Sequence, residues 1–182
     1  MISLALGATS KTFIEQMDQG KLNESQVLPV ITLYQPWASW IMRLWKTIET
    51  REHNRFACLN GKRILIHAGQ RTDASPFATQ NPFLSKEQIF HNPDEIINGF
   101  ILGSAYVSNV GWLDASHSSK ALIDCHHTSR FGLFLEWIIP EIEPIPVKGE
   151  MGIWYYDLSR KEKVKKPNVE IMGRAQQTSL WD

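Results

Sequence analysis

The chain has 182 residues, 43% of them hydrophobic, and its 19 basic and 19 acidic side chains cancel to a formal net charge of zero. This length supports one well-buried core and is too short for two. A neutral chain is not typical of proteins that hold long nucleic acids through many phosphates, because such binding needs a surplus of basic groups. The basic groups are nevertheless concentrated locally: residues 43–71 hold seven Lys or Arg and two acidic residues, a local charge of +5.

The two cysteines, Cys58 and Cys125, are too few for a disulfide framework and lack the spacing of metal ligands. The apolar start ISLALGA has no basic residue before it, unlike a secretory signal, and no apolar run approaches transmembrane length. We therefore expect a cytoplasmic protein without a membrane partner.

The first expected elements are a helix and a strand. Residues 9–19 begin with hydroxyl caps, place large apolar side chains at helical spacing and stop at Gly20, which predicts a short helix. Residues 1–27 are accordingly expected to form an N-terminal helical extension. The β-branched and apolar residues 28–33 predict the first strand of the main domain.

Pro36 predicts the start of a second helix, because the amides of a first helical turn have no partner within the helix and proline has no N–H to lose. The residues that follow place large apolar side chains three and four positions apart, which gives one apolar face. These residues are Trp37, Trp40, Ile41, Leu44 and Trp45. The start of this helix is expected to present unpaired N–H groups to an anion or a carbonyl.

The next segment, KTIETR at residues 46–51, has the pattern of an extended strand. In a regular strand Lys46 faces one side, while Glu49 and Arg51 face the other. An irregular strand edge instead lets the three charged side chains converge. The sequence leaves both arrangements open.

Four later segments also have the composition of strands. They span residues 62–68, 100–110, 130–139 and 151–158. Gly103 suggests a bend or bulge inside the second of them, and Pro140 is expected to end the third. The polar stretch between residues 70 and 99 holds one helix candidate, residues 85–90.

Several strands, few helices and no strand–helix alternation predict an α+β fold, a small antiparallel or mixed β-barrel with peripheral helices. This domain is expected to span residues 28–158. The residues after Leu158 are charged, poor in large apolar side chains and interrupted by Pro167. Residues 159–182 are therefore expected to form a solvated tail.

In order and spacing, these blocks resemble the ASCH domain family, named for homology to activating signal cointegrator, within the PUA-like superfamily. The resemblance is carried by QPWASWI at 35–41, KTIETR at 46–51, GKRILIHA at 61–68, the FILGSAYV strand, RFGLFL and PVKGEMGIW at 146–154. It implies a small PUA-like barrel with a cleft beside the QPWA helix and the KTIETR segment. It also implies an RNA-binding or nucleotide-binding module.

Some members of the family resemble hydrolases. One branch removes an acetyl group from a modified cytidine with a lysine and a threonine, and Lys46 matches that lysine while Glu49 occupies the threonine position. Another branch resembles a ribonuclease that relies on lysine and hydroxyl side chains. Two further departures from the family pattern are Trp45, where a glycine is common, and Gln70, where a basic residue is usual.

The resemblance and the local positive charge together suggest a site for RNA or a modified nucleotide. In this hypothesis Lys46 and Arg51 hold phosphate, and Glu49 accepts a hydrogen bond from a base edge. Trp37 offers its ring for base stacking. If the protein is an enzyme, Lys46 and Glu49 are the catalytic residues, with Glu49 as general base. Further binding residues expected around the cleft are Gln35, His67 and Lys148, and no cofactor is implied.

Several of these residues also have a purely structural interpretation. Lys46, Glu49 and Arg51 make an ordinary salt-bridge cluster if their strand is exposed, and such surface pairs contribute little stability. A single histidine on a strand, such as His67, is more often a hydrogen-bonded core residue than a catalyst. A lysine beside a turn, such as Lys148, is commonly only solvated.

The run DCHH at 124–127, with His117 before it, contains the residue types of zinc ligands. Adjacent residues do not normally share one tetrahedral ion with good geometry, and a second pair is missing. We therefore predict no metal site.

The C-terminal residues QQTSLWD resemble the short peptide by which bacterial replication and repair proteins bind the sliding clamp. In that peptide a glutamine and a leucine–aromatic pair occupy adjoining pockets, and aromatic anchors carry much of the energy of small interfaces. The matching residues are Gln177, Leu180 and Trp181. The alternative is that this tryptophan docks on its own domain.

Overall fold

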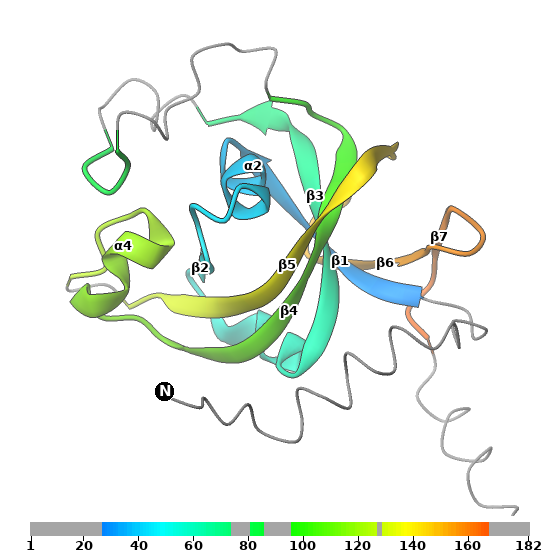
Figure 1. Ribbon diagram of the computed structural model, residues 1–182. Coiled ribbons are helices and arrows are strands. Elements are labelled where there is room, and N and C mark those ends of the chain that lie inside the picture. Colours follow the sequence, from blue (N-terminus) through cyan, green and yellow to red (C-terminus); the bar gives the residue numbers. More distant parts are fainter. Residues whose placement is uncertain (1–26, 74–80, 86–95, 127–128, 168–182) are drawn as a thin grey trace, which may run out of the picture.

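The computed structural model describes residues 27–73, 81–85, 96–126 and 129–167 (Figure 1). The helix expected at 9–19 lies outside the described residues, as does all but Ser85 of the helix expected at 85–90. The clamp-binding peptide also lies outside them and stays a prediction. Among the described residues, none of the helices has the length and apolar character needed to cross a membrane.

The fold is built on a seven-stranded sheet with the order β2-β5-β4-β3-β1-β6-β7. Its strands are β1 Val27–Gln35, β2 Ile48–Arg51, β3 Lys62–Thr72, β4 Phe100–Trp112, β5 Phe131–Pro146, β6 Ile153–Asp157 and β7 Glu162–Val164. The β1 and β3 strands run parallel, and all other neighbours pair antiparallel. A mixed sheet with few helices agrees with the predicted α+β fold. No pairing among the described residues joins β2 to β7, so the predicted barrel closure is not found in the strand pairing.

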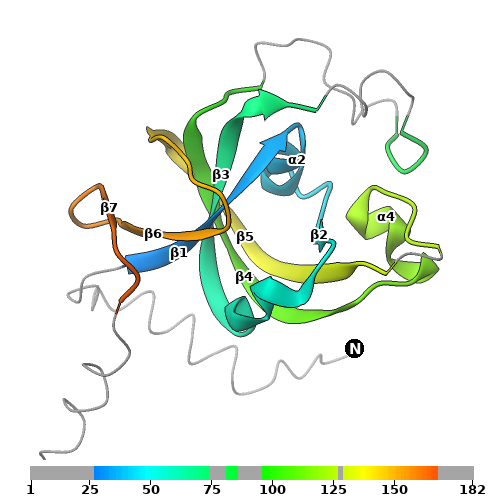
Figure 2. The same ribbon diagram turned by 180° about the vertical axis from the view of Figure 1, so that it is seen from behind.

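The sheet is strongly curved, and helix α2 (Trp37–Met42) lies against its concave side (Figure 1). The long strands β4 and β5 bend around this helix, which contacts β1, β3, β4 and β5. The view from behind shows β6 and β7 leading away from it (Figure 2). The described residues also form three short helices, η1 Asn54–Leu59, η4 Ala115–His117 and α4 Ser118–Ala121.

Neighbouring residues of β1 and β3 face opposite sides of the sheet, and both sides are buried. Ile31 and Ile66 pair with each other and belong to the main apolar cluster. The adjacent pair, Val30 and Leu65, belongs to a second cluster that includes Trp154. Burial on both faces explains why these strands appear in the sequence as nearly continuous apolar runs rather than alternating ones.

Helix α2 is shorter than the sequence predicts. It ends at Met42, because Leu44 adopts the left-handed backbone conformation, with φ of 61°, and cannot continue a right-handed helix. Leu44 is consequently 61% exposed instead of joining the apolar face. The early end of the helix turns the chain toward β2 and carries Lys46 with it.

The β5 strand is longer than predicted, since it continues past Pro140 to Pro146. Pro140 pairs with Gly103 of β4, in a part of β5 that β2 does not reach. A proline on such a strand edge removes no ladder hydrogen bond that the sheet needs. The β4–β5 register shifts between Ile101 and Gly103, which confirms the predicted irregularity at this glycine.

The sequence analysis missed β7, whose residues were expected in a solvated tail. β7 pairs with β6 through a turn that follows Asp157. The buried Asp157 carboxylate accepts hydrogen bonds from the backbone N–H groups of Ser159 at 2.9 Å and Arg160 at 3.1 Å. The Ser159 hydroxyl also donates to this carboxylate, and this bond, with the backbone bonds, holds the pKa of Asp157 below its usual value. A short polar hairpin is thus held by its turn rather than by apolar burial.

Candidate ligand site around Lys46

Gln35, the last residue of β1, fixes the start of α2. Its side chain is fully buried; the amide Nε2 donates to the carbonyl of Ile97 at 2.7 Å, and Oε1 accepts from the backbone N–H of Ser39 at 3.1 Å. Ser39 carries one of the first-turn amides that a helix leaves unpaired. The polar helix start predicted from the sequence is therefore partly occupied by the chain itself.

Lys46 is buried at the centre of the predicted site, with 1% of its surface exposed. Its ammonium donates a hydrogen bond to the carbonyl of Ala121, at the end of α4, at 2.6 Å. Its Nζ lies 3.7 Å from Glu49 Oε2 and 5.1 Å from the centroid of the Trp37 ring. Lys46 thus joins α2, α4 and β2.

Glu49 and Arg51 extend the charged group along β2. Arg51 Nη2 lies 3.4 Å from Glu49 Oε1, and the guanidinium lies 4.6 Å from the centroid of the Phe56 ring. Lys46 precedes β2, which begins at Ile48, so it does not follow the alternation of that strand. The convergent arrangement is therefore the one that forms. We call Trp37, Lys46, Glu49 and Arg51 the Lys46 cluster.

Burial lowers the pKa of Lys46, and the neighbouring Glu49 carboxylate opposes this shift. An ammonium group inside the protein loses hydration, so its neutral amine forms more readily. A lysine in this environment is a better base and nucleophile than a solvated lysine, which stays protonated near neutral pH. The cluster therefore brings an amine, a carboxylate and a guanidinium close together.

Trp37 forms the aromatic wall of the cluster. Its indole N–H donates to the Asp73 carboxylate at 3.2 Å, and its ring meets Trp40 edge to face with centroids 5.0 Å apart. These contacts and the Lys46 ammonium fix the orientation of the ring. Trp37 keeps part of its surface exposed, whereas Trp40 is buried, so Trp37 is the ring of this pair that a ligand base can reach.

His67 and Lys148 lie apart from the cluster. His67 is 1% exposed; its Nε2 donates to the carbonyl of Val147 at 2.9 Å, and its ring packs closely against Gly149. Burial lowers its pKa. Lys148 is exposed. Within the described part of the chain, no hydrogen bond, ion pair or ring contact joins either residue to Lys46, so the structure brings together only part of the predicted site.

Over 65% of its length, the chain is similar to solved structures of an ASCH protein. A crystal structure of ASCH from Zymomonas mobilis matches with a TM-score of 0.42 and 19% sequence identity, covering 65% of this chain and 72% of that chain. A serine-to-alanine mutant of the Z. mobilis protein matches with a TM-score of 0.42 and 20% identity, covering 65% and 73%. A tyrosine-to-phenylalanine mutant matches with a TM-score of 0.41 and 19% identity, covering 65% and 74%. No protein-family model and no curated protein matches the chain.

The Lys46 cluster borders a surface pocket without lining it. This pocket, of about 450 Å³, is lined by Thr47 and Ile48 from the KTIETR segment together with Lys120 of α4 and residues of β4 and β5. This pocket is therefore reached by Thr47 and Ile48 of the KTIETR segment and not by Lys46, Glu49 or Arg51. Within the cluster, access from solvent is through the partly exposed Trp37 and through Arg51, whose side chain is 23% exposed.

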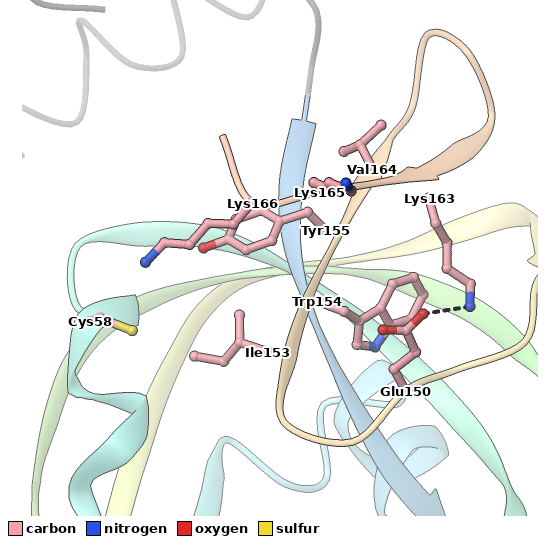
Figure 3. Close-up of a pocket in the computed structure, with 9 residues that line it drawn as sticks. All are labelled: Cys58, Glu150, Ile153, Trp154, Tyr155, Lys163, Val164, Lys165 and Lys166. Atoms are coloured by element: carbon pink, nitrogen blue, oxygen red, sulfur yellow. Dashed lines mark hydrogen bonds and ion pairs between the residues drawn. The ribbon is translucent and has the colours of Figure 1, made fainter. Parts of the chain in front are cut away.

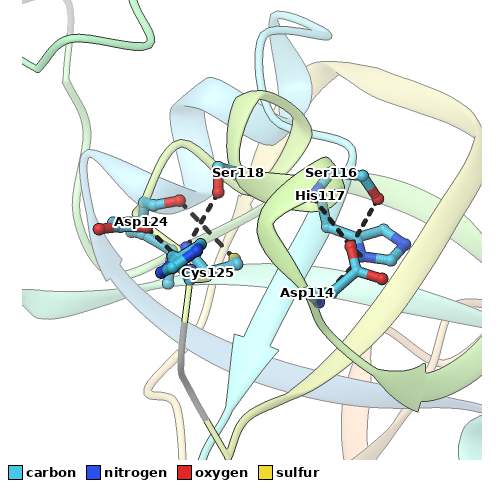
Figure 4. Close-up of polar contacts among 8 residues, drawn as sticks. Asp114, Ser116, His117, Ser118, Asp124 and Cys125 are labelled. Atoms are coloured by element: carbon cyan, nitrogen blue, oxygen red, sulfur yellow. Dashed lines mark hydrogen bonds and ion pairs between the residues drawn. The ribbon is translucent and has the colours of Figure 1, made fainter.

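Residues considered as zinc ligands take part in local hydrogen bonds that stabilise turns (Figure 4). The backbone N–H of Asp114 donates to His117 Nδ1 at 3.1 Å, and Asp124 accepts from the backbone N–H of His126 at 2.8 Å. In the described part of the chain, which omits residues 127–128, no three His, Cys, Asp or Glu side chains are placed to hold a metal ion.

Sequence reasoning missed two groups beside Lys46. One is the carbonyl of Ala121, 75 residues away in the chain. The other is the buried thiol of Cys125, close enough for Lys46 and Cys125 to influence each other's pKa; burial raises the pKa of the thiol. The backbone N–H of Cys125 donates to Ser118 Oγ at 3.0 Å, which holds this loop in place (Figure 4). Because every residue has a backbone carbonyl, the sequence does not indicate which carbonyl will bind Lys46.

Proposed function

We propose that this protein is an ASCH-type, PUA-like module that binds a short RNA or a modified nucleotide at the Lys46 cluster. The proposal is carried by one observation: a partly exposed indole, an amine, a carboxylate and a guanidinium meet in the two segments that resemble the family. The curved sheet around α2 is compatible with the PUA-like barrel that the resemblance implies.

The burial of the cluster supports a role in binding. Apolar side chains of similar volume stabilise a protein interior at least as well as a buried ion pair does. The fold therefore does not need Lys46 and Glu49 to be charged where they lie. Ionised groups held at such positions, with a shifted pKa, are typical of functional sites.

Each member of the cluster suits one part of a nucleotide. Arg51, the most exposed of the three charged residues, presents a guanidinium that matches a phosphate in geometry and charge. Glu49 accepts a hydrogen bond from a base edge, and Trp37 stacks on the base. The zero net charge of the chain favours a short ligand over a long duplex.

Replacing Arg51 by glutamine is expected to weaken RNA binding by at least about tenfold, because one charge-assisted contact is lost. Stability is expected to change by less than about 1 kcal/mol, since the side chain is partly solvated and Glu49 keeps Lys46 as partner. Fluorescence anisotropy with a labelled, short, random-sequence RNA at low salt measures the affinity, and a panel of modified nucleosides tests the single-nucleotide form.

Arg71→Gln is the matched control, because Arg71 is an exposed residue of β3 outside the cluster and the change in net charge is the same. Equal affinity of Arg51→Gln and the unaltered protein would show that the cluster is structural. Equal weakening by both variants would show that only overall charge matters.

The second candidate is a hydrolase of an acylated nucleoside or of RNA. The position of Glu49, 3.7 Å from the Lys46 Nζ, favours it. In this mechanism Glu49 takes a proton from the attacking water, and the Lys46 ammonium polarises the carbonyl or phosphoryl oxygen. The N–acyl or P–O bond then breaks, and the protonated Glu49 returns its proton to the leaving amine or alcohol. Glu49→Gln is expected to slow the hydrolysis of N-acylated cytidine or RNA by at least about 100-fold. Absence of turnover on both substrates by the unaltered protein excludes this candidate and leaves the binding module.

A further inference from the structure

A second pocket, of about 520 Å³, opens where the β6–β7 hairpin lies beside η1 (Figure 3). Small-molecule sites commonly enclose about 300–1,000 Å³. None of the residues that line this pocket belongs to the Lys46 cluster. Its ligand chemistry therefore has to be worked out from its own lining.

The lining carries an excess of positive charge. Lys163, Lys165 and Lys166 all line the pocket, and Glu150 is its one acidic residue, which leaves +2. Lys163 pairs with Glu150 at 2.9 Å and lies 5.5 Å from the centroid of the Trp154 ring. Lys165 and Lys166 are exposed and have no ion-pair partner in the described part of the chain. These two ammonium groups are available to an anion.

An aromatic ring lies next to the available lysines. Tyr155 of β6 pairs with Val164 of β7, and its partly exposed ring lies beside Lys166 on the Cys58 side of the pocket (Figure 3). Burial raises the pKa of Tyr155, so its hydroxyl remains protonated at neutral pH and can donate a hydrogen bond. The pocket thus combines two ammonium groups with one phenol ring.

The frame of the pocket is held independently of any ligand. The β6 strand pairs with β1, and Trp154 Nε1 donates to Thr32 Oγ1 at 3.1 Å. The hairpin turn is closed by the bonds that Asp157 accepts. A pocket on such a frame loses little conformational freedom on binding, which favours affinity.

We propose that this pocket binds the phosphate of a nucleoside phosphate, either as a free nucleotide or within a single-stranded RNA. Lys165 and Lys166 contact the phosphate oxygens, and the base lies against the ring of Tyr155. Ammonium groups bind phosphates strongly, and a phenol ring accepts the flat face of any base. This site is separate from the Lys46 cluster and does not depend on the function proposed there.

A nucleoside phosphate fits better than an acidic peptide. Carboxylate side chains use the lysines but leave the face of Tyr155 without a matching surface. A nucleotide occupies both and has a size suited to the volume of the pocket. Polyglutamate therefore serves as the competing ligand in the test.

Cys58 provides a direct measure of occupancy, because it lines this pocket and is exposed, whereas Cys125 is buried. The full chain is treated with N-ethylmaleimide, an uncharged thiol reagent, in the presence of ADP, a short single-stranded RNA, inorganic pyrophosphate or polyglutamate. Mass spectrometry gives the labelling rate of each cysteine. ADP or RNA at saturation is expected to slow labelling of Cys58 at least about fivefold.

The double variant Lys165→Gln/Lys166→Gln is expected to raise the concentration needed for half-protection at least about tenfold. Lys161→Gln, which removes one positive charge, is the control, since Lys161 is exposed, lies in the same hairpin and does not line the pocket. A change of less than about twofold is expected for it. Protection that survives the double variant, or that Lys161→Gln weakens equally, overturns the proposal.

The ligands separate the remaining outcomes. Protection by ADP and not by RNA assigns the pocket to free nucleotides, and the reverse assigns it to an RNA strand. Protection by pyrophosphate or polyglutamate as strong as that by ADP overturns the assignment to a nucleoside phosphate. No protection by ADP or RNA also overturns it. Loss of RNA binding in Arg51→Gln with Cys58 protection intact would separate the two sites.

Discussion

Replacing Lys46 by alanine is expected to lower the free energy of unfolding by about 3 kcal/mol. The substitution leaves a cavity at a fully buried position and an unpaired carbonyl at Ala121. It also reduces the cationic partners of Glu49 from two to one, Arg51. Urea denaturation measures the change, since its midpoint falls with stability while its slope reports whether the unfolded state has altered.

Two further variants separate the causes of this loss. Lys46→Met keeps most of the side-chain volume and removes the buried ammonium, so the unpaired carbonyl dominates and a loss of about 1–2 kcal/mol is expected. Lys62→Ala removes an exposed lysine at the start of β3 and should change stability by less than about 0.5 kcal/mol. If Lys46→Ala is as stable as Lys62→Ala, the Lys46 side chain is solvated rather than buried.

This expectation determines how binding at the cluster has to be tested. A variant that loses about 3 kcal/mol also loses folded protein, so weaker binding by Lys46→Ala does not by itself identify a ligand contact. Arg51 is the better probe, because its side chain is 23% exposed. Comparing the two variants separates a damaged fold from a lost contact.

The strands were predictable where a local pattern decides them. β1, β3 and β4 are rich in apolar and β-branched residues, and both of their faces contribute to buried apolar clusters, so an apolar run implies a strand. The irregularity at Gly103 followed from the absence of a side chain. The mixed sheet followed from the number of strands and the scarcity of helices.

Strand ends depended on pairing partners that a sequence does not identify. Pro140 stops a strand only where its missing N–H has a neighbour to bond, and at this position β5 has no β2 beside it. β7 has few large apolar side chains, and its formation depends on the turn at Asp157. The end of α2 depends on the backbone conformation of Leu44, which leucine adopts only in a supporting tertiary context.

The grouping of three charged side chains in one segment was predictable from the sequence, and the burial of Lys46 was not. The convergence of Lys46, Glu49 and Arg51 was one of two arrangements consistent with the sequence. Lys46 is buried beside α4, whose Ala121 carbonyl accepts its hydrogen bond from a distant part of the chain. His67 lies in β3, which contacts α2, but its ring contacts Val147 and Trp154 rather than the Lys46 cluster.

Gly103→Ala is the other substitution expected to lower the free energy of unfolding by about 3 kcal/mol. This value is near the upper end of the range for substitutions that overpack a protein interior. A Cβ at this position would meet the carbonyl oxygen of Ile139 and would lie 2.8 Å from Cα of Pro140, both backbone atoms. Backbone atoms cannot rotate away as a side chain does, so β4 and β5 have to separate at the bulge. Thermal and urea denaturation measure the effect.

The same glycine also links the sheet to the candidate site. Its added Cβ would lie 2.5 Å from the sulfur of Met42, the last residue of α2, so relief of the contact displaces the helix that carries Trp37. Gly103→Ala is therefore expected to weaken RNA binding as well. Gly111→Ala, on the same strand, is the control, because its Cβ meets no atom closer than 3.4 Å and should cost less than about 1 kcal/mol. Equal stability of the two variants would mean that β4 and β5 are not packed this closely at the bulge, and unchanged RNA binding by a destabilised Gly103→Ala would place the ligand away from α2.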